Sequence, residues 1–343
     1  MVHGEQFGHP RRWRGGFVLV AVLVLTCLLT VLVGRLTIST MTDLELSRAR
    51  AQAVKNRAAL ESGIALARAL LVLHRREAEV DTLDDPWREG ALTFDQGGVA
   101  VTMGIEDEES KLPVVQLLEA HDPQDSRQFK KGLLHFIQRA STDLRLDGDD
   151  VRRWLVTNQF LLNLPADLAD SILFEVPGSG GSPAAEALLT AWTDGVVNVN
   201  TASRECLLFL WGSEAKGLVE AVLTHRAGEP FVTPEEVFAL PGGGRVLRPP
   251  KGVRLAAQSN VFTVSVQAHS GPSRACMRAV LVRRNGRVDV VFRQNVSEVE
   301  LPAPARPLNL GNLAIAQRGS RGSPAAPCGV ALQTEVRPLP PCM

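Results

Sequence analysis

Four aspartates lie close together near the middle of the 343-residue chain, and their carboxylates have the composition of a loop that holds a hard cation such as calcium. They are Asp143, Asp147, Asp149 and Asp150. Aspartates are also favoured in the first turn of a helix, because the helix dipole attracts negative charge there. The cluster therefore has two interpretations, and a helix start is at least as well supported as a cation site.

The histidines that could serve as bases or metal ligands are dispersed along the chain. Apart from His3 and His9 near the N-terminus, none of them has ligand-type spacing: His74, His121, His135, His225 and His269. The sequence also lacks the G-x-S-x-G, H-E-x-x-H and P-loop motifs. We therefore expect a protein that is not an enzyme.

The glycine-rich segment Leu240-Pro241-Gly242-Gly243-Gly244 resembles the hairpin of helix–hairpin–helix DNA-binding modules. Amides of such a hairpin hold a phosphate at a helix N-terminus, and Arg245 and Arg248 lie nearby. However, the chain has 37 basic and 37 acidic residues and 5% aromatic residues, which gives no support for binding to a polyanion. A membrane-anchored DNA-binding protein of the DNA-uptake type, acting through Gly242 and Arg245, is kept as the alternative. The simpler interpretation is that these glycines, with Asn198 and Asn200, only shape turns.

The five cysteines form no C-x-x-C pair, so a zinc or redox motif finds no support. Cys27 lies among apolar residues and is expected to act as a small hydrophobic side chain. In an oxidising compartment, the other four could form two disulfide bonds in any of three connectivities: Cys206, Cys276, Cys328 and Cys342.

The most distinctive segment is the apolar run from Phe17 to Val33, which contains no charged residue. As a helix it would extend roughly 25 Å, near the short end of what spans a hydrocarbon core. Because Arg11, Arg12 and Arg14 precede it, the positive-inside rule places the N-terminus in the cytoplasm. An ordinary anchor and an uncleaved secretory signal explain these features equally well.

The helical pattern continues beyond this run. No proline occurs between Phe17 and Asp85. Apolar residues recur every three or four positions, which predicts an amphipathic face: Leu46, Ala49, Ala53, Leu60, Ile64, Ala67 and Leu71. We expect one helix over residues 17–77, apolar all round over 17–33. Its amphipathic part needs a sheet or other helices to cover it.

A short basic leader ending in Gly16, an apolar run beginning at Phe17 and a continuing amphipathic helix resemble the type IV pilins and pseudopilins. The resemblance implies that a prepilin peptidase removes residues 1–16 on the cytoplasmic side, between Gly16 and Phe17. It also implies that Phe17 becomes N-methylated and that the apolar half is retained as a filament-forming helix in the inner membrane.

Ala21 would be the fifth residue of the mature chain, where most pilins carry a glutamate. A carboxylate there is costly in an apolar setting unless it is paired with a neighbouring subunit's terminal amine. The minor pseudopilin K family of type II secretion (the GspK family) resembles this chain in lacking it. The resemblance implies a subunit that caps the tip of the pseudopilus, with other minor pseudopilins as partners and contact with a secreted substrate as a weaker expectation.

Beyond the helix, alternating apolar residues predict a strand from Val99 to Ile105, followed by an acidic turn over 106–112. Helical patterns dominate residues 116–255. Two strand-like runs flank Asn285-Gly286, a strong hairpin signal, within residues 256–298. Residues 299–343 are rich in proline, arginine and alanine and are expected to be a flexible tail.

Within the helical part, N-x-N-T-A at Asn198 to Ala202 and the segment around Arg226 to Phe231 resemble the inserted domain of the K pseudopilins. Thr201 or Ser203 is expected to cap the next helix, and Thr233 with Pro234 to start another. The expected fold is α+β: a pilin-like helix on a small antiparallel sheet, whose first part is 78–115, with a large helical insertion. The resemblance also implies calcium in that insertion, with ligands that the sequence leaves open.

Overall fold

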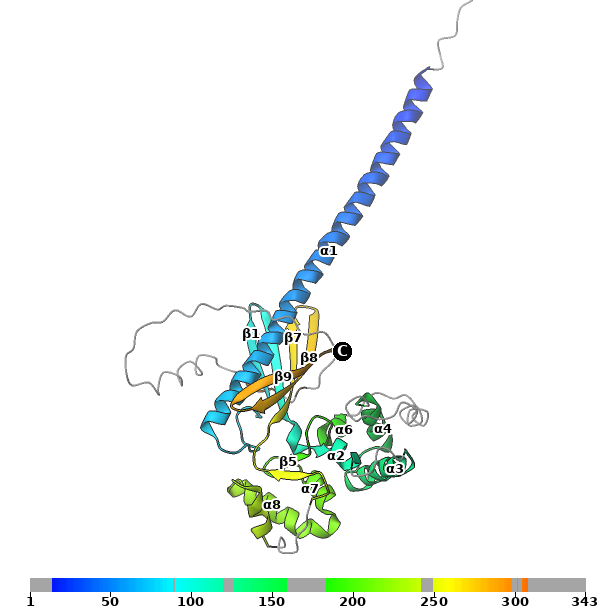
Figure 1. Ribbon diagram of the computed structural model, residues 1–343. Helices are drawn as coiled ribbons and strands as arrows, with labels where there is room; N and C mark the ends of the chain where they lie inside the picture. Colours follow the sequence, from blue (N-terminus) through cyan, green and yellow to red (C-terminus); the bar gives the residue numbers. More distant parts are fainter. Residues whose placement is uncertain are drawn as a thin grey trace, which may run out of the picture.

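The computed structural model describes residues 14–88, 90–119, 126–158, 183–241, 249–297, 301 and 304–307. It is an α+β protein, as predicted, in which a long helix leads into a sheet module and then a helical module (Figure 1). Several predicted features lie outside the described residues: the start of the leader, His121, the segment from Gly242 to Arg248, Cys328 and Cys342, and most of the tail.

Helix α1 (Arg14–Glu77) contains 64 residues and is about 96 Å long at 1.5 Å per residue. It begins three residues before the predicted start at Phe17. Figure 1 shows its N-terminal half projecting away from every other labelled element. The predicted apolar face is buried only over its second part, because the sheet first covers the helix near Asn56. Leu46, Ala49 and Ala53 are therefore exposed, contrary to the prediction.

Six strands form the main sheet in the order β10-β1-β2-β7-β8-β9. All neighbours are antiparallel except β1 and β10, which are parallel. The predicted early strand and the predicted hairpin at Asn285-Gly286 are present, and β2 pairs with β7 as expected. The strands are β1 (Ala91–Gln96), β2 (Val99–Asp107), β7 (Val261–Ser270), β8 (Ser273–Arg284), β9 (Arg287–Val296) and β10 (Pro304–Pro307).

Two strands of the main sheet are not among the predicted strands. Strand β1 lies before the predicted strand at Val99, and β10 lies in the part expected to be a flexible tail. Helix α1 ends at Glu77, as predicted, and the loop that follows is buried around Trp87. The sequence pattern predicts β1 only weakly. The strand is short and mostly half-buried, so apolar and polar residues do not alternate strictly along it.

The packing of α1 on the sheet explains where the first core lies. Leu60, Ile64, Ala67 and Leu71 contact a sheet face built from alternate residues of β2, β7 and β8. Gly63 lies at the closest approach, because a Cβ built there would be 2.6 Å from Cγ1 of Val266. Glycine is therefore required at this point of the helix.

The helical module has a second core of its own, with Trp154, Phe209, Val219 and Phe231 among its buried residues. Two small parallel sheets, β3 with β4 and β5 with β6, lie among the predicted helices. The α-helices are α2 (Val114–Glu119), α3 (Ser126–Asp143), α4 (Gly148–Thr157), α6 (Pro183–Leu188), α7 (Arg204–Trp211) and α8 (Lys216–Gly228). The shorter elements are η1 (Glu108–Ser110), η2 (Ser213–Ala215), η3 (Pro234–Ala239), β3 (Leu112–Pro113), β4 (Leu189–Thr190), β5 (Val196–Asn198) and β6 (Arg254–Ala256).

The predicted caps and turns explain several boundaries in this module. The Ser203 hydroxyl accepts a hydrogen bond from the amide of Cys206 and caps α7. Thr233 and Glu236 form a capping box at the start of η3, with Pro234 in its first position. Asn285 and Gly286 both have positive φ angles, 51° and 73°, as a tight two-residue hairpin requires.

Candidate functional site

The N-terminal half of α1 is the first candidate site, because its apolar side chains have no protein around them. We call residues 18–33 the anchor segment. Its large side chains are 51–71% exposed. The most apolar 18-residue window of the helix has a mean hydropathy of 2.6 and no buried residue. By its length and composition, this helix is suited to be a single-pass membrane anchor.

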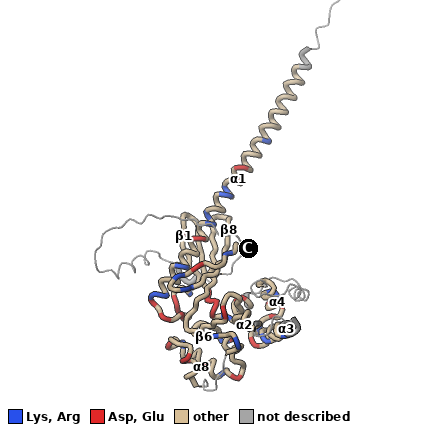
Figure 2. Tube along the Cα trace, viewed as in Figure 1, with Lys and Arg blue, Asp and Glu red and all other residues tan. Residues whose placement is uncertain are grey.

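The polar groups of the anchor segment are satisfied within the helix itself. The hydroxyl of Thr26 donates to the carbonyl of Leu23, and that of Thr30 donates to the carbonyl of Thr26. The backbone is helical throughout, so its amides and carbonyls are paired. Between Val18 and Gly34 there is no charged residue, as Figure 2 shows along the upper part of α1. The segment therefore meets the requirements of a hydrocarbon environment.

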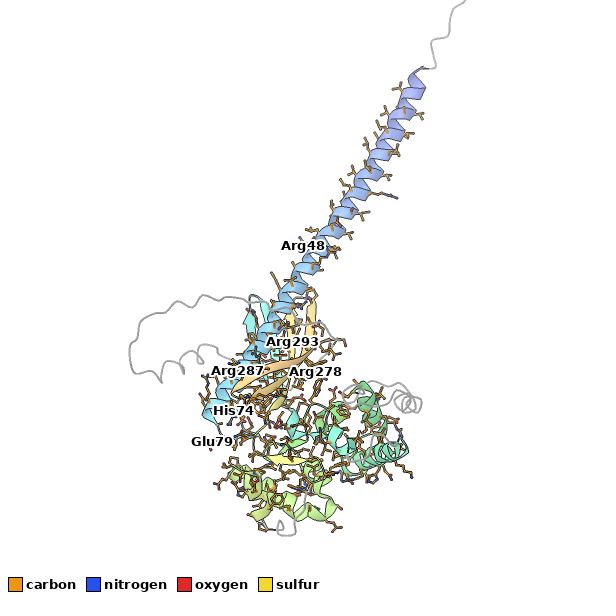
Figure 3. All side chains as sticks on the ribbon, viewed as in Figure 1. Arg48, His74, Glu79, Arg278, Arg287 and Arg293 are labelled. Carbon is orange, nitrogen blue, oxygen red and sulfur yellow. The ribbon has the colours of Figure 1, made fainter. Side chains whose placement is uncertain are left out.

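Residues 35–55, which we call the neck segment, join the anchor segment to the sheet. Here charged residues such as Arg35, Asp43 and Arg48 alternate with exposed apolar side chains such as Met41 and Val54. Figure 3 shows the side chains around Arg48 extending from the helix with no neighbouring element. The neck segment thus offers a mixed surface that could contact another protein.

The predicted processing residues lie at the start of this helix. Gly16 and Phe17 are in the first turns of α1, and Ala21 lies exposed one turn further along. Cleavage after Gly16, methylation of Phe17 and the significance of Ala21 stay predictions.

A second group of functional side chains lies where α1 ends, and the sequence did not indicate it. His74 on the last turns of α1 has its Nε2 3.3 Å from Oδ1 of Asp81 and 3.0 Å from Oδ2 of Asp85. Hydrogen bonds to Asp81 and Asp85 raise the pKa of His74 to about 9, against the effect of burial. The three possible ligand atoms lie within 4.8 Å of one another. The raised pKa favours a protonated imidazole, which donates to the carboxylates and does not act as a metal ligand.

Asp81 is shared between this ion pair and the sheet. Nη1 of Arg283 donates to both carboxylate oxygens of Asp81, at 3.1 and 3.0 Å, and both residues are almost fully buried. The amide of Ser259 donates to Oδ2 of Asp81 at 2.8 Å. The end of α1, the loop after it and strand β8 are therefore fixed to one another by charged groups.

The same network reaches the helical module through Asp107, at the end of β2. Oδ2 of Asp107 accepts hydrogen bonds from the hydroxyls of Ser259 (2.6 Å) and Thr201 (2.5 Å). Burial raises the pKa of Asp107 to about 6. Asn198 donates to the Ser259 hydroxyl, and Asn200 to the carbonyl of Phe231. The asparagines thus shape a turn, as their simpler interpretation predicts, and they also tie the two modules together, which was not predicted.

The predicted acidic turn forms a further buried contact between the modules. Nζ of Lys111 lies 3.0 Å from Glu106 and 2.8 Å from Glu108, and these carboxylates raise the pKa of Lys111 despite its burial. Lys111 and Thr190 favour the charged form of Glu108, so its pKa is lowered. The Thr190 hydroxyl donates to Glu108 at 2.5 Å. The positive charge of Lys111 therefore has a structural role, because it holds the carboxylates of Glu106 and Glu108 together.

The aspartate cluster forms a helix start rather than a cation loop. Asp147 caps α4, where its carboxylate accepts from the amide of Asp149 at 3.0 Å. Asp149 pairs with Arg152 and Asp150 with Arg153. Because these carboxylates are engaged by arginines and by a backbone amide, the aspartates at this helix start do not form a calcium cage. Calcium binding stays a prediction, and no ligand residues are assigned to it.

The remaining histidines and cysteines are not brought together. Nδ1 of His225 lies 3.0 Å from the carbonyl of Glu229, and its ring stacks on Phe231, which is a structural role. Cys206 and Cys276 are buried free thiols, and Cys27 is an exposed free thiol. No disulfide bond joins the cysteines that the structure describes.

Comparisons with known proteins add the following. No family model matches the chain, and no curated protein matches it. Among solved structures, the fold is similar to a chain of the GspK–GspI–GspJ complex of the type 2 secretion system from enterotoxigenic Escherichia coli. The TM-score is 0.47 and the identity 15%, over 74% of this chain and 99% of that chain. At these values the likeness concerns the course of the chain alone.

Proposed function

We propose that this protein is a minor pseudopilin of a type II secretion system that caps the tip of the pseudopilus. The observation that carries the proposal is a single helix that begins with an exposed, uncharged anchor segment and ends as the spine of a sheet module. This combination suits a subunit that is stored in a membrane and works in a helical filament. Its role is assembly rather than catalysis.

The exposed apolar surface explains why the subunit needs either the membrane or the filament around its helix. Large apolar side chains left in water are costly, at about 25 cal/mol per Å². Lipid tails are as apolar as leucine, so the anchor segment loses little when it exchanges lipid for the helices of other subunits. Assembly then depends on packing between helices, to which the neck segment adds charged and apolar contacts. Other minor pseudopilins are the proposed partners.

The proposed tip position is supported by the place of the helical module. In Figure 1, α3, α7 and α8 lie at the end of the molecule opposite the anchor segment. A subunit stacked beyond this end would meet the module before it could add its own helix. Ala21 supplies no carboxylate for the terminal amine of an earlier subunit, as expected for the first subunit of a filament. Contact with a secreted substrate there is a weaker proposal.

The proposed processing also has a physical reason. The three arginines of the leader hold the N-terminus in the cytoplasm, at a cost of several kcal/mol for any charge moved into lipid. Cleavage between Gly16 and Phe17 removes them, so the mature helix can leave the inner membrane as the filament extends into the periplasm. The predicted calcium requirement of the helical module is proposed on the resemblance alone.

Processing is tested by expressing the full chain in bacteria with and without a prepilin peptidase and measuring its intact mass. We expect loss of residues 1–16 and gain of one methyl group on Phe17 when the peptidase is present. Gly16→Leu should abolish the loss, and Gly15→Leu, the matched control one residue away, should leave it intact. An N-terminus that stays at Met1, or a cut beyond Val33, would contradict the proposal.

A further inference from the structure

A pocket of about 320 Å³ lies between the loop that follows α1 and the second half of helix α8, and it has no role in the proposed function. The loop contributes Leu83 and Asp84, and α8 contributes Leu223, Arg226 and Ala227. The volume lies at the lower end of the range for sites that hold small organic groups. Arg226 and Asp84 carry the charges among the described lining residues, so they decide what the pocket can bind.

Arg226 has one edge of its guanidinium free. Its Nη1 donates to the carbonyls of Val199 and Ala202, at 2.8 and 2.7 Å. Its Nε and Nη2 have no hydrogen-bond partner in the part of the chain that the structure describes, and neither is among the fully buried atoms that lack one. Arg226 is half-buried and lines the pocket, so this edge is accessible to a ligand there.

Arg226 also differs from most half-buried arginines in having no acidic partner. Two arginines of the described residues that are at least half-buried form no ion pair there, Arg226 and Arg88. The others pair with carboxylates: Arg139, Arg152, Arg153, Arg204, Arg278 and Arg283. Each of these six charges is offset within the chain itself.

Arg88 and Arg226 lie near each other. Burial and the positive charge of Arg88 lower the pKa of Arg226. Nη1 of Arg88 is itself buried without a partner, and Arg88 does not line the pocket, so it acts through its charge and not through a contact. Two like charges with no acid paired to either are unfavourable, and an anion in the pocket would offset them.

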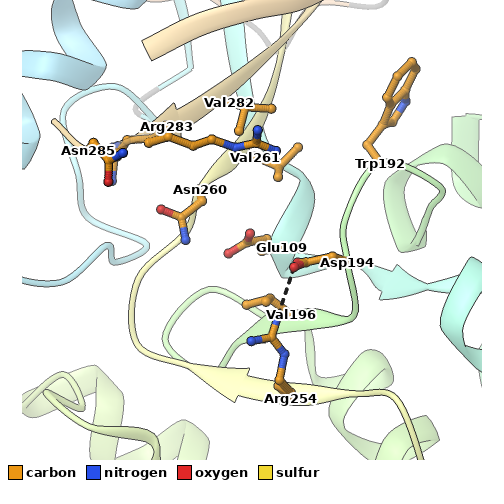
Figure 4. Close-up of a pocket in the computed structure, with 11 residues that line it drawn as sticks. Glu109, Trp192, Asp194, Val196, Arg254, Asn260, Val261, Val282, Arg283 and Asn285 are labelled. Carbon is orange, nitrogen blue, oxygen red and sulfur yellow. Dashed lines mark hydrogen bonds and ion pairs between the residues drawn. The ribbon is translucent and has the colours of Figure 1, made fainter. Parts of the chain in front are cut away.

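A larger pocket, of about 550 Å³, shows the more common arrangement of charges (Figure 4). There Arg254 pairs with Asp194 at 2.9 Å, along the dashed line in the figure, and the buried Arg283 pairs with Asp81. The positive charge of Arg254 is therefore offset by a residue of the same chain, whereas that of Arg226 is not.

The other lining residues restrict the kind of anion. Asp84 is exposed and forms no ion pair among the described residues, so its carboxylate disfavours a doubly charged anion such as phosphate. Leu83, Leu223 and Ala227 present aliphatic surface. The N–H groups of Nε and Nη2 are parallel and match the two oxygens of a carboxylate. A singly charged carboxylate on an aliphatic body therefore fits best.

We propose that this pocket binds a carboxylate on an aliphatic body, with the carboxylate on Nε and Nη2 of Arg226 and the body against Leu83 and Leu223. The carboxylate belongs either to a small organic acid or to an acidic side chain of another protein, because both present the same group. This proposal does not rest on the pseudopilin role, and each can fail without the other.

The test is isothermal titration of the full chain in detergent, with detergent alone as the blank. The ligands are 3-methylbutanoate, its uncharged amide and inorganic phosphate. At pH 7 we expect binding of the acid, and binding of the amide and of phosphate that is weaker by about tenfold or more.

Asp84→Asn removes the repulsion at the pocket, and we expect it to strengthen binding of the acid about threefold and binding of phosphate by more. Because Asp84 is exposed, this variant should fold. Asp289→Asn, the same change at an exposed position of β9, is the control and should alter neither affinity.

Arg226→Lys keeps the charge but removes the paired N–H groups, and we expect binding of the acid that is weaker by about tenfold or more. Arg254→Lys, in the pocket of Figure 4, is the matched control and should bind the acid as the wild type does. Should Arg226→Lys fail to fold, the comparison of acid with amide and the Asp84→Asn variant still decide.

The peptide acetyl-Ala-Glu-Leu-amide and its glutamine counterpart separate the two sources of the carboxylate. A glutamate peptide that binds about tenfold more tightly than both 3-methylbutanoate and the glutamine peptide indicates an acidic side chain, and otherwise a small acid is indicated. No binding of either acid, equal affinity for acid and amide, or unchanged affinity in Asp84→Asn or in folded Arg226→Lys would overturn the proposal.

Discussion

His74 holds its charge because two aspartates surround it, and this makes the end of α1 sensitive to pH. Its pKa of about 9 lies above the ordinary value of 6.5, so protonated His74 stabilises the folded state. This contribution is complete below about pH 6.5 and is lost as the pH rises through 9. After allowance for the partial exposure of His74, its magnitude is about 1–2 kcal/mol.

We therefore expect His74→Gln to destabilise the protein by about 1–2 kcal/mol at pH 6 and to have little effect at pH 10. The measurement is the free energy of unfolding by urea at both pH values, taken as the difference between wild type and variant, because Glu109 titrates in the same range. His135→Gln, at an exposed position of α3, is the control and should change neither value. A difference that is independent of pH would show that His74 acts through packing alone.

At the scale of elements, the contact between α1 and the sheet depends on a missing side chain. Alanine normally stabilises a helix interior by about 1 kcal/mol relative to glycine. At Gly63 the added methyl group would lie 2.6 Å from Val266, which must then move. We expect Gly63→Ala to reduce the free energy of unfolding by about 1–3 kcal/mol, measured by urea denaturation.

Gly217→Ala is the matched control, because Gly217 lies in α8 with nothing within 4 Å of the added atom, and it should be neutral or stabilising. A second change on the sheet, Val266→Ala, should restore part of the loss in the Gly63→Ala protein. If Gly63→Ala were as stable as the wild type, the close approach of α1 to β7 would be wrong.

The elements also show what sequence patterns can and cannot predict here. Helix α1, strand β2 and the hairpin at Asn285-Gly286 were predictable, since each has a local signal: periodicity, alternation or a turn pair. Strand β1 lacks strict alternation, and β10 is a short strand that pairs at the sheet edge. The polar network around Asp81 was not predictable, because its members are brought together from residues far apart in the chain.

The described residues form two large hydrophobic cores, one under α1 and one in the helical module, and a small third cluster of Val261, Val280 and Val282. None of the three includes a residue before Ala59. The modules are joined by hydrogen bonds and ion pairs at Asp107, Asp81 and Lys111 rather than by a continuous apolar core. The anchor segment and the neck segment therefore contribute exposed surface but almost no packing. Folding of the modules and insertion of the anchor segment should be separable.

Deletion of residues 1–34 tests this separation. We expect a protein that is soluble without detergent and unfolds at the same temperature as the full chain, because every core side chain is retained. Deletion of residues 1–62 is the control: it removes Asn56, which hydrogen-bonds Ser273, together with Ala59 and Leu60, and should lower the melting temperature by several degrees. Circular dichroism gives the melting temperature and size-exclusion chromatography the solubility. Aggregation of the shorter deletion would mean that the exposed neck segment, and not only the anchor segment, needs a partner helix to cover it.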